Sequence, residues 1–451
     1  MQEVKSKYQN IKLVTSKNLL FRRIIYVSFI IIFFIVTPII ILYTEGYRYN
    51  FKRGKVQKTG IFIISSIPKK ADIYLNGKMI EGDQTPARIE KLLPADYEIQ
   101  LSQKGYHDWT KKLQISENST TFAEDVILWK NNLPIQLSEY QIIDWLASPD
   151  NKKIVFVTQD RKIITLDLNN QEFHDIYQAG EYTNPKILEW SNTGKKILIK
   201  SDYKYLVLDT ERYYIKPTII NDNNYKSVKW NLKNDNTLYA SNNLGIWRID
   251  LFTRETKLVF NKEISDFIIT NDIIYYFYKD IVYKQKLSEN NNPEIIDGIK
   301  CQDCLFLNYN FPRLILLNKE LQELFIIDPK MKNKTIKKEA KNIFWLNKNT
   351  FIFYNSWEIW IYELDKREPE LITRIGAGID EAIWHPEGRH IIFTSENKIK
   401  IIELDNRELR NVIELFSGLK INHLTINADG KNIYFSAIIS DQEYVMELNI
   451  K

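Results

Sequence analysis

Residues 188–209 read LEWSNTGKKILIKSDYKYLVLD, and this stretch carries the pattern that decides the fold. A short apolar segment ends at Trp190, and a polar turn containing Gly194 follows it. Two further runs rich in β-branched and aromatic residues come next, and the second ends on Asp209. Short runs of this composition, separated by turn residues, predict three consecutive antiparallel strands.

Units of this kind follow one another along the chain at intervals of about 40 residues, a period typical of propeller blades with four strands. Their first segments carry a bulky apolar residue at the corresponding position: Trp145, Trp190, Trp230, Phe267, Leu305, Trp345, Trp384 and Leu424. The sequence therefore predicts an all-β fold in which residues 133–451 form a β-propeller of eight blades. Seven blades is the alternative, because the units near Phe267 and Leu305 lack the tryptophan and the polar turn.

The two ends of this region are expected to share one blade. The last unit ends on its third strand, residues 444–449, and no fourth strand follows it. Leu133–Leu137 precedes the first unit and has the character of an outer strand. We therefore expect this N-terminal strand to complete the final blade, which closes the ring and leaves only short outer edges exposed.

The polar turns between the first and second strands also resemble one another. They are residues 148–152 (SPDNK), 191–195 (SNTGK), 385–389 (HPEGR) and 427–431 (NADGK). Together with the Trp before the turn and the Leu-Asp that closes the third strand, this pattern resembles the TolB-type propeller repeat over residues 140–451. The resemblance implies a propeller fold and does not identify a ligand.

Acidic residues close the third strand of most units and invite a catalytic or calcium-binding interpretation. They are Asp167, Asp209, Asp250, Asp328, Asp365 and Glu403. A catalytic residue occurs once, whereas these recur in unit after unit. We therefore expect them to accept hydrogen bonds from backbone N–H groups in the turn before the outer strand.

Residues 24–43 (IIYVSFIIIFFIVTPIIILY) contain no charged residue. A helix of this length spans about 30 Å, which is the thickness of the hydrocarbon core of a membrane. Pro38 is tolerable in a membrane helix, and Tyr43, Tyr47 and Tyr49 are expected to lie at the interface. A cleavable signal peptide has a shorter apolar region followed by a small-x-small site, so we predict an uncleaved transmembrane anchor rather than a buried core helix.

The orientation of this helix is not decided by charge alone. The preceding flank carries Lys5, Lys7, Lys12, Lys17, Arg22 and Arg23, and the following flank carries Arg48, Lys52, Arg53, Lys55 and Lys58. A short N-terminal tail is readily retained inside, whereas a long C-terminal region can translocate regardless of its charge. We predict a cytoplasmic basic tail (1–23), a juxtamembrane linker (44–58) and a single-pass protein of the cell membrane with the bulk of the chain extracytoplasmic.

Residues 59–130 are expected to form a small β-sandwich. Residues 60–67 read as an apolar strand that Pro68 ends, and Asn76-Gly77 is a strong signal for a tight hairpin. The stretch resembles the PEGA domain, with matching segments at 65–68 (SSIP), Ala71, 74–78 (YLNGK), Thr85-Pro86, Leu93-Pro94 and 104–106 (KGY). It departs from the family at 68–71, which reads PKKA, and at Ala95, where glycine is usual. The resemblance implies a surface-associated spacer or presentation module without catalysis.

Composition narrows the function classes further. The chain has 62 basic and 57 acidic residues and a net charge of +5, which is too balanced for a dedicated nucleic-acid binder. It has two cysteines, Cys301 and Cys304, which excludes a disulfide framework. Their C-x-x-C spacing lacks the further ligands of a zinc site and the βαβ context of a redox motif, since Leu305–Leu307 reads as a strand. We predict a pair of strand thiols.

The sequence contains no recognisable catalytic apparatus. G-x-S-x-G, the P-loop, G-x-G-x-x-G and H-E-x-x-H are all missing from it. The histidines are scattered at His107, His174, His385, His390 and His423. Lys330–Lys338 is interpreted as a solvated loop between blades, with contact to an anionic polymer or lipid as the alternative, and 290–292 (NNN) as a polar loop. We therefore predict no catalytic, cofactor-binding or metal-binding residues and no cofactor.

These observations favour a non-catalytic interaction or scaffold protein of the cell envelope that binds a protein or a surface polymer through its propeller. The first alternative is a propeller-based hydrolase or lyase, for which close carboxylates in a deep funnel, or a histidine beside a carboxylate, would be evidence. The second alternative is the sensor subunit of a signalling or transport complex. That role needs a partner chain, because a cytoplasmic tail of this length is too short for an effector domain.

Overall fold

The computed structural model describes residues 15–451 except 52, 181–183, 203, 222–223, 271, 289–291, 300, 302–303, 308–312, 331–334 and 367. Lys5, Lys7, Lys12 and Lys52 of the helix flanks, residues 331–334 of the lysine-rich loop, and Asn290 and Asn291 therefore lie outside the described residues. The chain divides into two compact units. Unit 1 runs to Leu128 and includes Arg407–Leu409, and unit 2 comprises Trp129–Asn406 and Arg410–Lys451.

Unit 1 begins with the helix α1, Thr15–Thr44, which contains Pro38. It starts before the apolar stretch, because Leu19, Leu20 and the arginines at 22 and 23 are good helix formers. Its segment Leu19–Thr44 is long and apolar enough to cross a membrane, and its apolar side chains are exposed. Among the described residues it is the one helix with these properties. This finding fits a membrane anchor or a signal sequence.

A two-stranded hairpin follows the helix, where the sequence suggested only a linker. It consists of β1 (Tyr47–Asn50) and β2 (Lys55–Lys58), which pair antiparallel with Tyr49 opposite Val56. Gly54 lies in the turn at a φ of 63°, a conformation that glycine adopts without steric cost.

The rest of unit 1 is a sandwich of two sheets, as the sequence predicts. A three-stranded sheet contains β6 (Ala87–Leu92), β3 (Gly60–Ile67) and β9 (Thr120–Ile127), in that order. A four-stranded sheet contains β5 (Lys78–Gln84), β4 (Asp72–Leu75), β7 (Ala95–Ser102) and β8 (Trp109–Ile115). Alternate residues of the strands meet in one core, including Phe62, Ile73 and Trp109. Asn76 and Gly77 both have positive φ, as the predicted hairpin turn between β4 and β5 requires.

Unit 2 contains, within its described residues, eight four-stranded antiparallel sheets, numbered 1 to 8 in chain order. Sheets 1 to 4 have these strands: β11 (Ile142–Ala147), β12 (Lys153–Thr158), β13 (Lys162–Asp167), β14 (Phe173–Gln178); β15 (Pro185–Trp190), β16 (Lys196–Ser201), β17 (Lys204–Asp209), β18 (Thr218–Asn221); β19 (Ser227–Asn231), β20 (Asn234–Asn242), β21 (Gly245–Asp250), β22 (Thr256–Phe260); β23 (Asp266–Thr270), β24 (Ile273–Tyr278), β25 (Ile281–Lys286), β26 (Glu294–Gly298).

The other four sheets continue the series: β27 (Leu305–Phe306), β28 (Leu314–Asn318), β29 (Glu323–Ile327), β30 (Ile336–Glu339); β31 (Asn342–Asn347), β32 (Thr350–Tyr354), β33 (Glu358–Glu363), β34 (Glu370–Arg374); β35 (Ala382–Trp384), β36 (His390–Ser395), β37 (Lys398–Glu403), β38 (Val412–Ser417); β39 (Lys420–Ile426), β40 (Asn432–Ile439), β41 (Gln442–Asn449). The fourth strand of sheet 8 is β10 (Ile135–Gln136), from the start of the unit.

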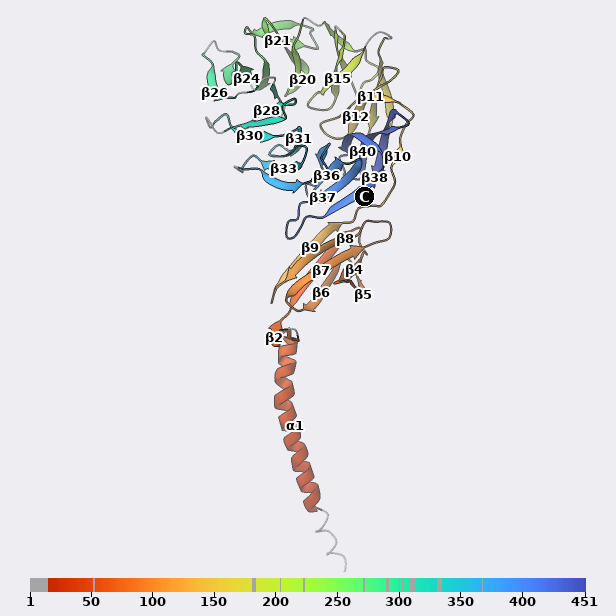
Figure 1. Cartoon of the computed structure of the whole chain (residues 1–451), viewed down its shortest axis with the longest axis vertical. Helices are drawn as coiled ribbons and strands as arrows, with labels where there is room; N and C mark the ends of the chain where they lie inside the picture. The colour runs from red at the N-terminus through yellow and green to blue at the C-terminus, as the bar shows by residue number, and fades with distance from the viewer. Residues whose placement is uncertain are drawn as a thin grey trace, which may run out of the picture. The chain divides into compact units, whose positions relative to one another are not determined.

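Neighbouring sheets pack face to face through apolar clusters, as in a β-propeller. Figure 1 shows the sheets of unit 2 following one another around a ring. Ile142 and Trp145 of sheet 1 share a buried cluster with Tyr434 and Val445 of sheet 8, so the first sheet packs against the last. The strand β10 pairs with β41, with Ile135 opposite Glu447.

Candidate functional site

The turn between the first two strands of a sheet is shaped by a side chain that accepts hydrogen bonds from the backbone. In sheet 1, the Ser148 hydroxyl accepts from the N–H groups of Lys152 and Lys153 at 3.2 and 2.9 Å. In sheet 8, the Asn427 carboxamide does the same for the two residues that follow its turn. Such local side-chain bonds compete with regular structure and favour turns. This explains the recurrence of Ser and Asn at the position.

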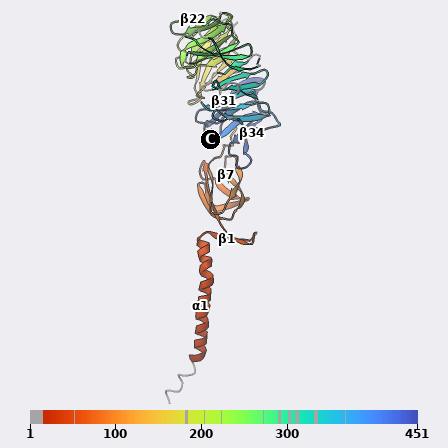
Figure 2. The same cartoon turned by 90° about the vertical axis from the view of Figure 1, so that its left-hand side faces the viewer.

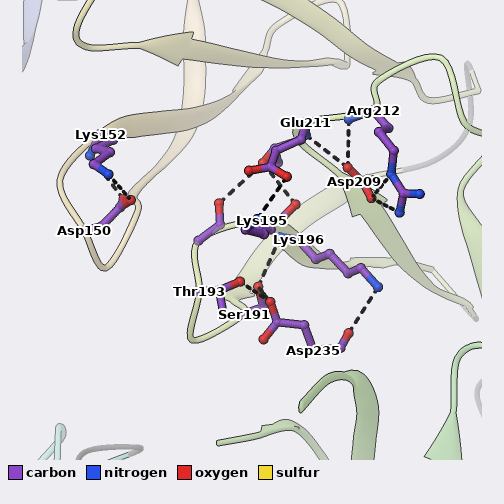
Figure 3. Close-up of polar contacts among 12 residues, drawn as sticks. Asp150, Lys152, Ser191, Thr193, Lys195, Lys196, Asp209, Glu211, Arg212 and Asp235 are labelled. Atoms are coloured by element: carbon purple, nitrogen blue, oxygen red, sulfur yellow. Dashed lines mark hydrogen bonds and ion pairs between the residues drawn. The ribbon is translucent and has the colours of Figure 1, made fainter. Parts of the chain in front are cut away.

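The turn of sheet 2 also binds the next sheet (Figure 3). The hydroxyls of Ser191 and Thr193 both donate to the Asp235 carboxylate, the first at 2.9 Å. Lys196 Nζ donates to Asn236 Oδ1 at 2.6 Å. The polar side chains of this turn are therefore used to join sheets 2 and 3.

The acids that close the third strands of sheets 1, 2, 3, 5 and 7 accept backbone hydrogen bonds, as predicted. Asp209 accepts from the N–H groups of Glu211 and Arg212 at 3.0 and 2.8 Å, and Figure 3 shows the Arg212 guanidinium beside the same carboxylate. Burial opposes the charge on Asp209, but the hydrogen bonds from Arg212 outweigh it and lower the pKa of the carboxyl. Asp250 likewise accepts from Phe252 and Thr253 N–H, each at 3.0 Å. These contacts give the acids a structural role.

Charged side chains also connect the first strands of successive sheets. Asp144 Oδ2 accepts the N–H of Ile187 at 2.8 Å, which joins β11 to β15. Lys229 Nζ lies 2.6 Å from Asp266 Oδ2, and the same oxygen accepts the N–H of Phe306 at 2.6 Å. Asp266 is buried, and 13% of the Lys229 side chain is exposed. Three sheets, 3, 4 and 5, therefore meet at one ion pair.

Glu381, just before β35, has a carboxyl group whose pKa lies close to neutral pH. Burial raises the pKa of its carboxyl to about 7, and the nearby Asp380 adds to the effect, while a hydrogen bond from Leu424 N–H opposes it. Its own N–H donates to Thr394 Oγ1 at 3.1 Å. The group can therefore exchange a proton near neutrality.

A histidine does lie beside a carboxylate, in a group that we call the closing cluster: Trp129, His385, Glu387, His390 and Lys451. His390 Nδ1 lies 2.5 Å from Glu387 Oε1, and Lys451 Nζ lies 3.2 Å from Glu387 Oε2. The rings of His385 and His390 pack edge-on against Trp129, with centroids 5.2 and 5.0 Å away. His385 Nε2 donates to the Gly430 carbonyl at 2.9 Å.

The closing cluster is a packed interior. Trp129 and His385 are each about 1% exposed. Burial lowers the pKa of His385 to about 4, which keeps the ring neutral at pH 7. Burial opposes the charge of Glu387, but the hydrogen bond with His390 and the charges of the neighbouring histidines and Lys451 together outweigh it and lower the pKa of the carboxyl to about 2. The cluster joins the segments before the first sheet and after the last strand to the turn of sheet 7.

Two shallow hollows of about 220 Å³ each occur on unit 2, one beside Asp175–Gln178 of β14 and one beside Asn231–Asn234. Both are smaller than the roughly 300 Å³ at which small-molecule sites begin. Over the described part of the chain, no group of three or more His, Cys, Asp or Glu is placed to hold a metal ion.

The prediction of two strand thiols is wrong, because Cys301 and Cys304 form a disulfide with their Cα atoms 5.8 Å apart. In a strand, residues three apart point to opposite faces. Both cysteines instead lie in irregular backbone before β27, where their side chains can converge. Both are buried in the cluster that contains Phe306 and Ile299.

The sequence also did not reveal the partners in the Lys229–Asp266 pair or in the closing cluster. The bonded residues are far apart in the chain, and only the arrangement of the sheets brings them together. The hairpin after α1 does have a local signal in the sequence: the alternating residues 47–51 (YRYNF), followed by Gly54.

Comparison with known proteins agrees with this description. Residues 59–126 match the PEGA domain family, which confirms the resemblance of the small sandwich. The sequence matches no curated protein.

The solved structures that resemble the chain include the following three. The C-terminal WD40 domain of Sif2 is 11% identical, with a TM-score of 0.47 over 71% of this chain and 97% of that one. The mitotic checkpoint complex is 9% identical, with a TM-score of 0.41 over 71% of this chain and 94% of that one. Dihydro-heme d1 dehydrogenase NirN in complex with DHE is 13% identical, with a TM-score of 0.47 over 70% of this chain and 77% of that one. The TolB-type repeat stays a prediction.

Proposed function

We propose that the chain is a membrane-anchored, extracytoplasmic, non-catalytic interaction protein of the cell envelope. In this proposal α1 anchors the chain, with the N-terminal tail in the cytoplasm. The PEGA domain stands next to the membrane, and the propeller binds a protein or a surface polymer.

The observation that carries the location is the disulfide between Cys301 and Cys304 in a chain with an apolar N-terminal helix. Disulfides form and persist in oxidising compartments and are rare in the cytosol. Both cysteines lie in unit 2, so the bond favours the placement of that unit outside the cytoplasm.

The absence of catalysis in the proposal is supported by how the polar side chains of unit 2 are used. Asp209, Asp235, Asp266 and Glu387 are all engaged in bonds between or within sheets. Exposed aromatic residues, in contrast, lie in a turn between two strands. Tyr213 and Tyr214 between β17 and β18 are exposed, and His174 stacks on Tyr213 with centroids 5.1 Å apart. Exposed aromatic residues are enriched at contact surfaces for partners.

Labelling of intact cells with a membrane-impermeant maleimide tests the topology. We expect Phe252→Cys, in an exposed turn of unit 2, to label without lysis, and Ser6→Cys, in the N-terminal tail, to label only after lysis. Both native cysteines are oxidised, so the unsubstituted chain is the background control. Labelling of Ser6→Cys but not of Phe252→Cys in intact cells would overturn the proposed orientation.

The binding role is tested by site-specific photocrosslinking from Tyr214 in cells, with Leu244 as a control position that is also exposed. We expect a discrete adduct at Tyr214 that disappears when Tyr213 is changed to Ser. Equal adducts at both positions, or none at Tyr214, would contradict a binding surface at this turn.

A further inference from the structure

The β1–β2 hairpin has its polar and apolar faces reversed relative to a soluble protein. Adjacent residues of a strand point to opposite faces, and residues paired across two strands share a face. Tyr49 and Val56 are paired, so they lie on one face, and their side chains are 50% and 51% exposed. Phe51 at the start of the turn is 89% exposed, and its ring lies 5.0 Å from that of Tyr49.

The opposite face of the hairpin is polar and buried. Asn50 and Gln57 are only 7% and 4% exposed. Asn50 Nδ2 donates to Gln57 Oε1 at 2.8 Å, and Gln57 Nε2 donates to Glu117 Oε1 at 2.7 Å. Asn50 Oδ1 also accepts the N–H of Arg53. Because these amides are satisfied, the hairpin holds a fixed orientation in which its apolar face stays outside.

The charge of the hairpin is of one sign. Residues 46–58 contain no Asp or Glu, and their basic residues are Arg48, Lys52, Arg53, Lys55 and Lys58. Basic residues close to a membrane are attracted to anionic lipid headgroups, and Tyr and Phe rings favour the boundary between headgroups and acyl chains.

The hairpin is also tied to the end of α1. Glu45 N–H donates to the Ile41 carbonyl at 2.9 Å, and Arg48 Nη1 donates to the Tyr43 carbonyl at 2.8 Å. The Arg48 guanidinium lies 3.5 Å from the centre of the Tyr43 ring. Figure 2 shows the hairpin running sideways from the end of the helix. An element that leaves a spanning helix sideways runs along the surface of the bilayer.

We propose that the β1–β2 hairpin docks on the lipid bilayer, with Tyr49, Phe51 and Val56 inserted at the interface. Lys58, which shares the face of Val56, and Arg53 in the turn lie against lipid phosphates. The occupant of this apolar face is lipid. The inference rests on the proposed role of α1 as a membrane anchor and adds a second, interfacial contact, which fixes the base of unit 1 against the surface.

The test uses the full chain in nanodiscs of mixed phosphatidylcholine and phosphatidylglycerol, with one nitroxide label at a time. Phe51→Cys reports on the hairpin, and Phe33→Cys reports on the helix. Phe252→Cys in unit 2 is the matched aqueous control, because its side chain is 88% exposed, much like that of Phe51. Collision with oxygen and with a water-soluble nickel complex is measured by power saturation of the spin-resonance signal.

We expect the labels at positions 33 and 51 to collide several-fold more with oxygen than with nickel, relative to the label at position 252. Exposure of position 51 to nickel equal to that of position 252, with position 33 in lipid, would overturn the inference and leave the anchor intact. An immobilised label at position 51 that neither reagent reaches would mean a protein partner and would also overturn it. A label at position 33 exposed to nickel would overturn the anchor itself.

Discussion

The ammonium of Lys451 lies 5.4 Å from the centre of the Trp129 ring, so the segment that enters unit 2 meets the segment that leaves it. The backbone reinforces this contact, because the N–H of Lys130 donates to the Ile450 carbonyl at 3.0 Å. Glu387, in the turn of sheet 7, forms an ion pair with Lys451. The stability of unit 2 should therefore depend on the titration of this cluster.

We predict that acid destabilises unit 2 through His385. Its folded pKa of about 4 lies below the unfolded value of 6.5. The unfolded chain therefore binds the extra proton first, so the stabilisation is full above pH 6.5 and is lost as the pH falls to about 4. The loss amounts to on the order of 3 kcal/mol. Glu387, with a folded pKa of about 2 against 4.5, continues the loss at lower pH.

The variant His385→Asn isolates this effect, because Asn427 occupies the same position in the turn of sheet 8. Thermal unfolding of the full chain in detergent, followed by near-ultraviolet circular dichroism, should show a shallower fall of the midpoint between pH 6.5 and 4 in the variant. His174→Asn, on the surface, should keep the steep fall. An unchanged slope in His385→Asn would refute the assignment.

We predict that Lys229→Met strongly destabilises unit 2, because it leaves the buried Asp266 carboxylate without its counter-charge. The expected cost in the free energy of unfolding is about 3 kcal/mol. Adding Asp266→Asn should recover much of this loss, since the amide oxygen can still accept from Phe306 N–H. Urea unfolding of the single and double variants measures both values, and a double variant as unstable as the single one would contradict the prediction.

We predict that Gly60→Ala destabilises the PEGA domain. A Cβ at this position would lie 2.5 Å from Ile115 Cγ2 and 2.6 Å from the Ser116 carbonyl oxygen. Relief of such crowding requires a backbone shift that costs about 2 kcal/mol. Gly298→Ala, where a Cβ meets nothing within 4 Å, is the control and should change stability by less than about 0.5 kcal/mol. Differential scanning calorimetry compares the two, and equal effects would refute the steric argument.

We predict that the unfolded, unreduced chain takes up no alkylating reagent, and that it takes up two equivalents after reduction, as counted by mass spectrometry. The double variant Cys301→Ser with Cys304→Ser should lose about 2 kcal/mol of stability, because a short cross-link still restricts the unfolded chain. Two alkylations without reductant, on protein isolated from the cell envelope, would mean that the bond is not formed there.

The repeating pattern was enough to locate the sheets of unit 2. First strands occur at all the expected positions, including the units of Phe267 and Leu305, which lack the tryptophan. Phe267 is buried as the tryptophans of sheets 1 and 2 are, whereas Leu305 is 45% exposed and its neighbour Phe306 is buried instead. Adjacent residues of a strand point to opposite faces, so the pattern located the strand but not the face that Leu305 occupies. The outer strand at Ile135 could be predicted because the last unit was one strand short.

Contacts between units of sequence could not be predicted in the same way. Periodicity fixes which face of a strand is buried, but it does not say that Lys229 meets Asp266 or that Lys451 meets Trp129. Those partners depend on the rotation between neighbouring sheets and on where the connecting loops lead. The disulfide was missed for a related reason: Cys301 and Cys304 lie in an irregular segment, whose course periodicity does not describe.

The pairing of Ile135 with Glu447 also constrains how the protein is made. During synthesis β10 leaves the ribosome long before β41 exists, so it must wait unpaired while the intervening sheets form. Termination anywhere before Gln442 would leave β10 without its partner and sheet 8 with an open edge. Truncated products should therefore be the species that quality-control proteases remove first.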